Sequence, residues 1–478
     1  MDLGGAAMRL LFLMIMLTAL AGYILANEQP TFRWAVVHDP SVIKVGNMYY
    51  VFGTHLQVAK SEDLMHWEQI NTSAHDKNPI IPNINEELKE ALSWARTRND
   101  IWAPQVIQLS DRRYYMYYCA STFGSPRSAI GIAVSDDVEG PYKHYTVIVK
   151  SGQVYSVDGP SEDGTQYDSR KHPNALDPGV FYDKEGNLWM VYGSWFGGIY
   201  ILKLDPNTGL PLPGQGYGKR LAGGNHSSME GPYVLYSPDT DYYYLFLSFG
   251  GLDYRGGYNI RVARSKNPDG PYYDPEGKSM ENCIGSKTVI SNYGAKLIGN
   301  FILSESNTID FRAFGYVSPG HNSAYYDPET GRYFIFFHTR FPGRGETYQL
   351  RVHQLFLNED GWFVMAPFPY AGETISELPD EEIVGEYQFI NHGKDITSKI
   401  KQPVRIKLNR DGTITGSVEG KWERKGHYIT LKINEGNTTV IYKGVVLKQW
   451  HYSEKKWVTV FTALSNHGVS VWGIRVEE

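Results

Sequence analysis

The chain has 478 residues, which is too long for one ordinary domain and long enough to bury a large core. Charged residues make up 21%, and the formal net charge is -6 with no long run of Lys or Arg. This balance excludes the basic footprint expected of a nucleic-acid-binding protein. Aromatic residues reach 14%, with 35 Tyr and 11 Trp, and this richness is typical of an all-β protein.

The first 26 residues differ from the rest of the chain. Arg9 precedes an apolar run from Leu10 to Leu20, and the small residues Gly22 and Ala26 follow it. This pattern predicts a secretory signal peptide over residues 1–26, and hence a secreted, extracellular protein. The alternative is an uncleaved membrane anchor, for which the apolar run is short. No other segment is apolar enough to cross a bilayer, so no membrane association is expected after cleavage.

Only two cysteines occur, Cys119 and Cys283. A chain of this size does not need a disulfide framework, because its core suffices. Cys119 lies in the apolar run YYMYYCA, which favours a buried thiol. Spacing alone leaves open whether the two residues pair.

Five segments share one pattern, in which a proline in most units precedes a strand, a turn and a Tyr-rich strand. They recur about every 70 residues: HDPSVIKVGNMYYVFGT from His38, WAPQVIQLSDRRYYMYYCA from Trp102, LDPGVFYDKEGNLWMVYGSW from Leu176, EGPYVLYSPDTDYYYLFLSFG from Glu230 and GHNSAYYDPETGRYFIFFHTR from Gly320. A second alternating strand, a turn and a short last strand follow each segment. Four strands repeated five times predict a five-bladed β-propeller over residues 27–370. An array of β-sandwiches is the alternative, and the constant two-hairpin order disfavours it.

A separate all-β accessory domain is predicted over residues 383–478. Short alternating strands there are divided by turn pairs such as Asp411-Gly412, which is typical of a barrel or a sandwich. Between Ile383 and Glu478, 15 Lys+Arg against 9 Asp+Glu give a net charge of +6. Such a domain could favour an acidic polysaccharide such as pectin, or simply present a solvated surface.

The propeller explains why acidic residues recur beside prolines. The first strand of each blade lines the central channel, so equivalent residues at the starts of these strands converge. Asp39, Asp177 and His321 share one position of the repeat, Glu230 lies one residue earlier, and Ala103 takes the position in the second unit. We therefore expect three carboxylates and one imidazole around a single cavity.

Two carboxylates that flank a bond are the requirement for hydrolysis of a glycoside. Asp39 and Glu230 form the predicted pair, and Asp177 is a third acid that would raise the pKa of a neighbouring acid by repulsion. Each Asp-Pro taken alone is more simply a turn. Their matching positions in the repeat favour catalysis.

The motifs HDPSV, LDPGVFYDKEGNLWMVYGSW, MEGPYV and SPGHNS resemble those of glycoside hydrolase family 43. Within that family they are most similar to the extracellular endo-1,5-α-L-arabinanases of the two-domain bacterial type. The resemblance implies a five-bladed propeller and an inverting mechanism with Asp39 as general base, Glu230 as general acid and Asp177 tuning the acid. Inversion requires the base and the acid to be about 6.5–9.5 Å apart.

The resemblance also implies a metal and a set of substrate contacts. His321 would hold one hydrated calcium ion through a ring nitrogen, which is unusual for a cation that prefers oxygen ligands. The expected substrate-binding residues are Asp39, Gly124, Asn174, Ala175, Leu176, Asp177, Ser194, Trp195 and Phe196, with Trp102 as a further candidate.

The predicted activity is therefore hydrolysis of internal α-1,5 links in plant cell-wall arabinan, including the side chains of pectin. An exo-acting α-L-arabinofuranosidase or β-xylosidase on the same fold is one alternative, because loop shape decides between endo and exo action. A carbohydrate-binding propeller without catalysis is the other, although it does not require all three acids.

Overall fold

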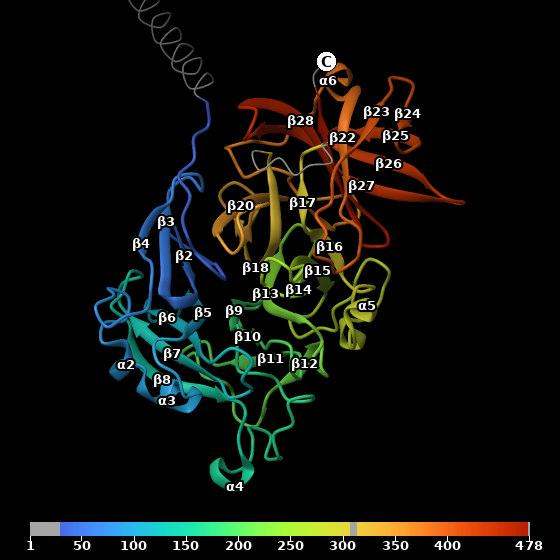
Figure 1. Ribbon diagram of the computed structural model, residues 1–478. Helices are drawn as coiled ribbons and strands as arrows, with labels where there is room; N and C mark the ends of the chain where they lie inside the picture. Colours follow the sequence, from blue (N-terminus) through green and yellow to red (C-terminus); the bar gives the residue numbers. More distant parts are fainter. Residues whose placement is uncertain (1–28, 306–312, 477–478) are drawn as a thin grey trace, which may run out of the picture.

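The computed structural model describes residues 29–305 and 313–476, and it consists of a β-propeller followed by a β-barrel (Figure 1). The predicted signal peptide, residues 1–26, lies outside the described residues. In the part of the chain that is described, no helix is both long and apolar enough to span a membrane.

The first four blades are four-stranded antiparallel sheets, as the repeats predict. Blade 1 contains β1 (Ser41–Val45), β2 (Met48–Gly53), β3 (Gln57–Ser61) and β4 (Glu68–Asn71). Blade 2 contains β5 (Ile101–Gln108), β6 (Tyr114–Ala120), β7 (Ala129–Ser135) and β8 (Lys143–Lys150). Blade 3 contains β9 (Gly179–Tyr182), β10 (Leu188–Tyr192), β11 (Ile199–Leu204) and β12 (Lys219–Ala222). Blade 4 contains β13 (Met229–Ser237), β14 (Tyr242–Phe249), β15 (Asn259–Ser265) and β16 (Ala295–Ile298).

Blade 5 has one strand more than the repeat pattern predicts. Its order is β17 (Phe301–Ile302), β18 (Gly315–Asp327), β19 (Arg332–Arg340), β20 (Tyr348–Leu357) and β21 (Phe363–Met365). The extra strand β17 is only two residues long and pairs with β18 at Phe301↔Tyr316. A strand this short leaves no periodic signal in the sequence.

The innermost strands of the five blades close into a ring. Strand β1 contacts β5, β5 contacts β9, β9 contacts β13, β13 contacts β18, and β18 returns to β1. Where the ring closes, the backbone N–H of Val42 in blade 1 donates to Oγ of Ser323 in blade 5, over 3.1 Å. The closure brings residues that are far apart in the sequence around one axis.

Hairpin chemistry matches the predicted turns. In blade 1, Val45 pairs with Met48 across the Gly46-Asn47 turn, and Gly46 has a φ of 59°, which a glycine adopts without strain.

The helices of the described residues are short: η1 (Thr54–Leu56), α2 (Ile84–Glu87), α3 (Lys89–Ala95), α4 (Tyr155–Asp158), η2 (Met280–Asn282), α5 (Lys287–Ile290) and α6 (Asp380–Ile383).

The C-terminal domain is a closed barrel, which settles the choice between barrel and sandwich. Its strands are β22 (Gly385–Asn391), β23 (Val404–Leu408), β24 (Thr413–Gly416), β25 (Gly420–Lys425), β26 (Tyr428–Glu435), β27 (Thr438–His451), β28 (Lys456–Ser465) and β29 (Ser470–Arg475). Closure by pairing of β22 with β29 removes exposed sheet edges.

The barrel lies against blades 4 and 5 (Figure 1), and the two domains share an apolar core. Phe301 of β17 meets Trp472 of β29 edge to face, with ring centroids 5.1 Å apart. The buried amide of Gln449 also donates to the carbonyl of Phe368, over 3.2 Å. The barrel is therefore fixed to the propeller rather than tethered by a flexible linker.

Cys119 and Cys283 are both buried and free, so they do not pair.

Candidate active site

Five equivalent residues of the propeller, one in or just before each innermost strand, share a left-handed backbone conformation. We call them the slot residues. Their φ values are 53° for Asp39, 38° for Ala103, 54° for Asp177, 58° for Gly231 and 44° for His321.

Positive φ is uncommon for residues other than glycine and clusters at functional sites. In blades 2, 4 and 5 the pairing register also shifts at the slot residue. A bulge of this kind re-aims a side chain away from the regular sheet alternation.

The carboxylate of Asp39 is surrounded by donors. The hydroxyl of Thr54 donates to Oδ2 over 2.5 Å, and Nδ1 of His38 lies 2.8 Å from the same oxygen. On the other side, Nδ1 of His321 lies 3.1 Å from Oδ1. Burial raises the pKa of Asp39, but the imidazoles of His321 and His38 outweigh burial and hold this pKa well below its ordinary value. Asp39 is therefore ionised and fixed.

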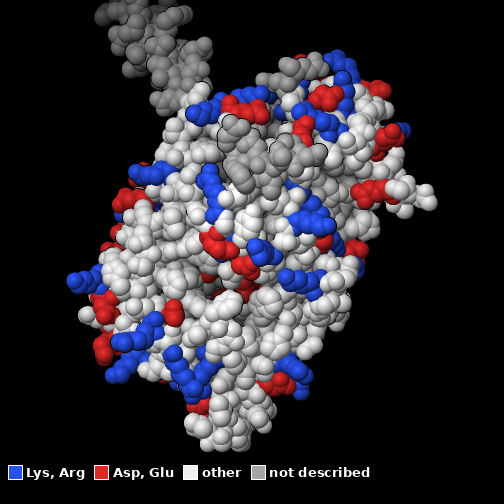
Figure 2. Space-filling view, in the orientation of Figure 1, with Lys and Arg blue, Asp and Glu red and all other residues white. Residues whose placement is uncertain are grey.

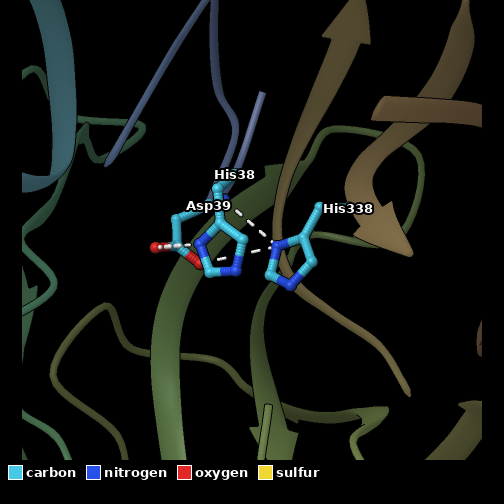
Figure 3. A group of neighbouring side chains, drawn as sticks. All are labelled: His38, Asp39 and His338. Atoms are coloured by element: carbon cyan, nitrogen blue, oxygen red, sulfur yellow. Dashed lines mark hydrogen bonds and ion pairs between the residues drawn. The ribbon is translucent and has the colours of Figure 1, made fainter. Parts of the chain in front are cut away.

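His338 lies beside Asp39 and supports it without a charge (Figure 3). Its Nδ1 accepts the backbone N–H of Asp39 over 3.1 Å, so its proton resides on Nε2. Burial and the neighbouring His38 lower the pKa of His338 well below its ordinary value. The ring of His338 stacks on that of His38, with centroids 3.9 Å apart. Among the described residues, His38, Asp39 and His338 also form a cluster close enough to hold a metal ion.

Glu230 and Asp177 are the other two acids of the site, and each interacts electrostatically with His321. Ser194 donates to Oε2 of Glu230 and Tyr258 donates to Oε1, each over 2.9 Å. Among the described residues, the Asp177 carboxylate accepts one hydrogen bond, from the backbone N–H of Gly231 over 3.2 Å.

Burial raises the pKa of both acids of this pair. The pKa of Asp177 reaches about 7, because the carboxylate of Glu230 adds to the effect of burial while His321 opposes it. Burial also raises the pKa of Glu230, but His321, Ser194 and Tyr258 oppose this rise because they stabilise its ionised form. The pair therefore retains a proton near neutral pH.

His321 lies among the three acids. Burial lowers its pKa, but Asp39, Asp177 and Glu230 outweigh burial and raise this pKa to about 9. The same negative field that holds a proton on this imidazole would attract a cation.

The acids and His321 line one cavity of about 610 Å³ on the face of the propeller. Asp39 and Glu230 thus flank a single hollow, as the ring closure predicts. In the view of Figure 2, acidic side chains lie in a hollow near the middle of the propeller. Elsewhere on this face Lys and Arg alternate with Asp and Glu, and no basic stripe is visible.

Most of the predicted substrate-binding residues also line this cavity: Trp102, Gly124, Asn174, Leu176, Ser194, Trp195 and Phe196. Ala175 does not line the cavity; it is fully buried, and its N–H donates to Oγ of Ser151. The side chain of Asn174 is itself bonded to Ser151 and to the carbonyl of Ser125.

The cavity contains residues that the sequence pattern does not single out. Phe123, which is 84% exposed, stands at the rim, and His226, Asp253 and Lys287 line the walls. Thr54, Tyr258 and His338 act behind the acids. The cavity residues and Tyr258 lie outside the repeated hairpins, whereas Thr54 and His338 lie within them at positions that the pattern does not single out.

Comparison with known proteins agrees with this geometry. The profile for "Glycosyl hydrolases family 43" matches residues 32–363, and that for a "C-terminal lipocalin-like domain" matches residues 367–473. The chain is 93% identical to "Extracellular endo-alpha-(1->5)-L-arabinanase" of Thermotoga petrophila, covering 98% of this chain and 100% of the relative. It is 53% identical to "Extracellular endo-alpha-(1->5)-L-arabinanase 2" of Bacillus subtilis, covering 93% and 94%.

A solved structure supports the fold directly. The crystal structure of endo-1,5-alpha-L-arabinanase from Thermotoga petrophila superposes with a TM-score of 0.94 at 94% identity, covering 94% of this chain and 100% of that chain. The profile spans all five blades, and the near-identical relative spans almost the whole chain. This chain therefore belongs to glycosyl hydrolase family 43.

Proposed function

We propose that the protein is a secreted endo-1,5-α-L-arabinanase that cleaves arabinan with inversion. The observation that carries this proposal is the placement of Asp39 and Glu230 on one cavity in opposite electrostatic environments. The pKa of Asp39 is lowered and that of Glu230 is raised, which is the division that separates a general base from a general acid. The names of the relatives with 93% and 53% identity supply the substrate and the endo action.

In this mechanism Asp39 removes a proton from the attacking water. Its carboxylate is ionised and held at both oxygens, so a lone pair can be directed at one fixed position. Inversion places this water between Asp39 and the anomeric carbon, and it requires a separation of about 6.5–9.5 Å between the two carboxyl groups.

Glu230 protonates the leaving oxygen on the opposite side of the bond. Ser194 and Tyr258 fix the orientation of its carboxyl group, and burial keeps it protonated to higher pH. The charges of Asp177 and Glu230 repel each other, so the two acids together retain one proton to higher pH than an isolated acid would. Asp177 thus tunes the acid without contacting the leaving group.

The residues present fit a cation at His321. Three carboxylates surround this imidazole, and among the described residues its Nδ1 alone has an ion-pair partner, Asp39. We infer that His321 holds one calcium ion through Nε2, with water filling the remaining positions. The bound ion would supply positive charge beside the acids. A single nitrogen ligand is weak for calcium, so the surrounding negative charge would contribute much of the affinity.

The cavity walls suit a sugar chain. Trp102, Trp195 and Phe196 present aromatic surface, and Gly124 leaves the backbone open to a close approach. The substrate we propose is plant cell-wall arabinan, including the side chains of pectin, and the protein is expected outside the cell after cleavage of residues 1–26.

The deciding experiment is a time course on linear debranched arabinan. Endo action releases a mixture of oligosaccharides early, whereas the exo alternative releases monosaccharide alone. Glu230→Gln and Asp39→Asn should each lower kcat by about 10²–10⁴-fold or more. The matched control is Glu329→Gln, an exposed carboxylate on a turn of blade 5. Full activity in either active-site variant would mean that the substituted residue is not the general acid or base. If the wild type does not hydrolyse arabinan, the result favours the propeller that binds carbohydrate without catalysis.

A further inference from the structure

We propose that Thr54 is a positioning residue that fixes the carboxylate of Asp39 through a hydrogen-bond relay from the backbone of blade 2. The inference rests on the proposed role of Asp39 as general base. It adds Thr54, the last residue of the first repeated segment, which the repeat pattern does not single out as functional, and it gives a function to Ala103, the slot residue with no polar side chain.

Thr54 is fixed by its own backbone beside Asp39. It begins the short helix η1, directly after the blade 1 strand β2. Its N–H donates to the carbonyl of His38 over 2.9 Å. The preceding residue, Gly53, packs so closely that a Cβ there would lie 2.1 Å from the same carbonyl oxygen. The position of the Thr54 side chain relative to Asp39 is therefore set by main-chain contacts.

The direction of the relay follows from the donors available. The backbone N–H of Ala103 donates to Oγ1 of Thr54 over 3.0 Å. A threonine hydroxyl has one proton to give, and this proton is directed at Oδ2 of Asp39 over 2.5 Å. The N–H of Ala103 thus occupies an acceptor site of the hydroxyl, and the hydroxyl rotor is held with its hydrogen toward the carboxylate.

The relay explains why Ala103 shares the strained conformation of the other slot residues. Its φ of 38° is costly for alanine and needs a compensating role. Gly231, the other slot residue without a functional side chain, donates its N–H to Oδ2 of Asp177 over 3.2 Å. Both slots therefore contribute a backbone N–H that orients an acid, directly in blade 4 and through Thr54 in blade 2.

The two carboxylate oxygens of Asp39 have different partners. Oδ2 is occupied by Thr54 and His38, whereas Oδ1 faces His321 and the cavity. Without the hydroxyl, the carboxylate loses one of the contacts that oppose its rotation. Since a general base must meet its water in a narrow range of positions, turnover should fall more than substrate binding.

The test compares Thr54→Val, which removes the hydroxyl at nearly constant volume, with Thr54→Ser, which retains it. The control is Thr462→Val, a buried threonine of the barrel whose hydroxyl has no partner among the described residues. Binding of a linear α-1,5-arabino-oligosaccharide is measured by calorimetry with each change in a Glu230→Gln background. The folded fraction of each variant without the Glu230 change is measured by circular dichroism, and kcat is referred to that fraction.

The expected result is a kcat lower by at least about tenfold in Thr54→Val, with the oligosaccharide Kd changed less than about twofold. Thr54→Ser should remain within about threefold of the wild type, and Thr462→Val should be unchanged. The proposal is overturned if Thr54→Val keeps the wild-type kcat per folded site while Asp39→Asn is inactive. Equal losses of binding and turnover would also overturn it, in favour of a structural role. An active Asp39→Asn would instead refute the proposed function itself.

Discussion

Tyr258 donates its hydroxyl hydrogen to Oε1 of Glu230 over 2.9 Å, from the residue just before strand β15. The ring is held in place because Gly320 packs against it, so closely that a Cβ on Gly320 would lie 2.1 Å from the ring. This bond stabilises the ionised form of Glu230 and opposes the rise of its pKa by burial.

Tyr258→Phe should shift the alkaline limb of the pH–rate profile to higher pH. The ring remains, so packing against Gly320 is retained, but the donor to the ionised carboxylate is lost. The pKa of Glu230 then rises, and the acid stays protonated over a wider range. The measurement is kcat/KM on linear arabinan across pH. An alkaline limb that does not move, or that moves to lower pH, would contradict the assignment of Glu230 as the acid.

Asp177→Asn should shift the same limb in the opposite direction. Above the Asp177 pKa of about 7, the substitution removes a neighbouring negative charge, so Glu230 ionises more easily there and the pKa of the acid falls. We expect the loss of activity to grow as pH rises above the new pKa, with a smaller effect at acidic pH. The matched control is Asp241→Asn, an exposed carboxylate on blade 4 that pairs with Lys184. A uniform loss at every pH would show that Asp177 acts on orientation alone.

The fold and the acids follow from the sequence because they share a period. Each blade repeats the same hairpins, and the X-Pro positions at Asp39, Ala103 and Asp177 mark equivalent points on the ring. The residues that tune the acids are not marked by a shared proline, although Thr54 ends the first repeated segment. Thr54 follows the last residue of a hairpin strand, and Tyr258 precedes an outer strand. Their contacts with Asp39 and Glu230 exist only once the ring and the hairpins have formed.

Local pattern also explains two differences in detail. The strand β17 escapes prediction because two residues show no alternation. Ala175 is adjacent to cavity residues in the sequence, yet the chain turns there and its side chain is buried. Adjacency in sequence therefore identifies the segment that approaches the sugar without identifying which side chains reach it.

Calcium binding should depend on His321 and should strengthen with pH. Without the ion, the carboxylates raise the pKa of His321 to about 9, so a cation must displace a proton at neutral pH. Affinity should therefore rise as pH approaches 9. Calorimetric titration of chelated protein tests this, with His321→Ala expected to abolish binding and His66→Ala, an exposed surface histidine, to preserve it. Equal calcium affinity in His321→Ala would place the ion elsewhere, and activity that survives exhaustive chelation would remove its role in turnover.

Lys296 should make the stability of the protein depend on alkaline pH. Its ammonium group is buried between propeller and barrel, where it donates to the carbonyls of His392 over 3.0 Å and Asp395 over 2.7 Å. Burial lowers its pKa to about 7, while the unfolded chain retains the ordinary value of 10.5. Between these values the unfolded chain binds more protons, so Lys296 contributes a free energy of unfolding that rises with pH, by at most about 1.4 kcal/mol per pH unit. Below pH 7 the slope from this group vanishes.

Denaturant unfolding at a series of pH values should show this rise in the wild type and its loss in Lys296→Met. The overall stability of Lys296→Met is lower because two carbonyls lose their donor. An unchanged slope in Lys296→Met would show that the amine stays charged in the folded interface.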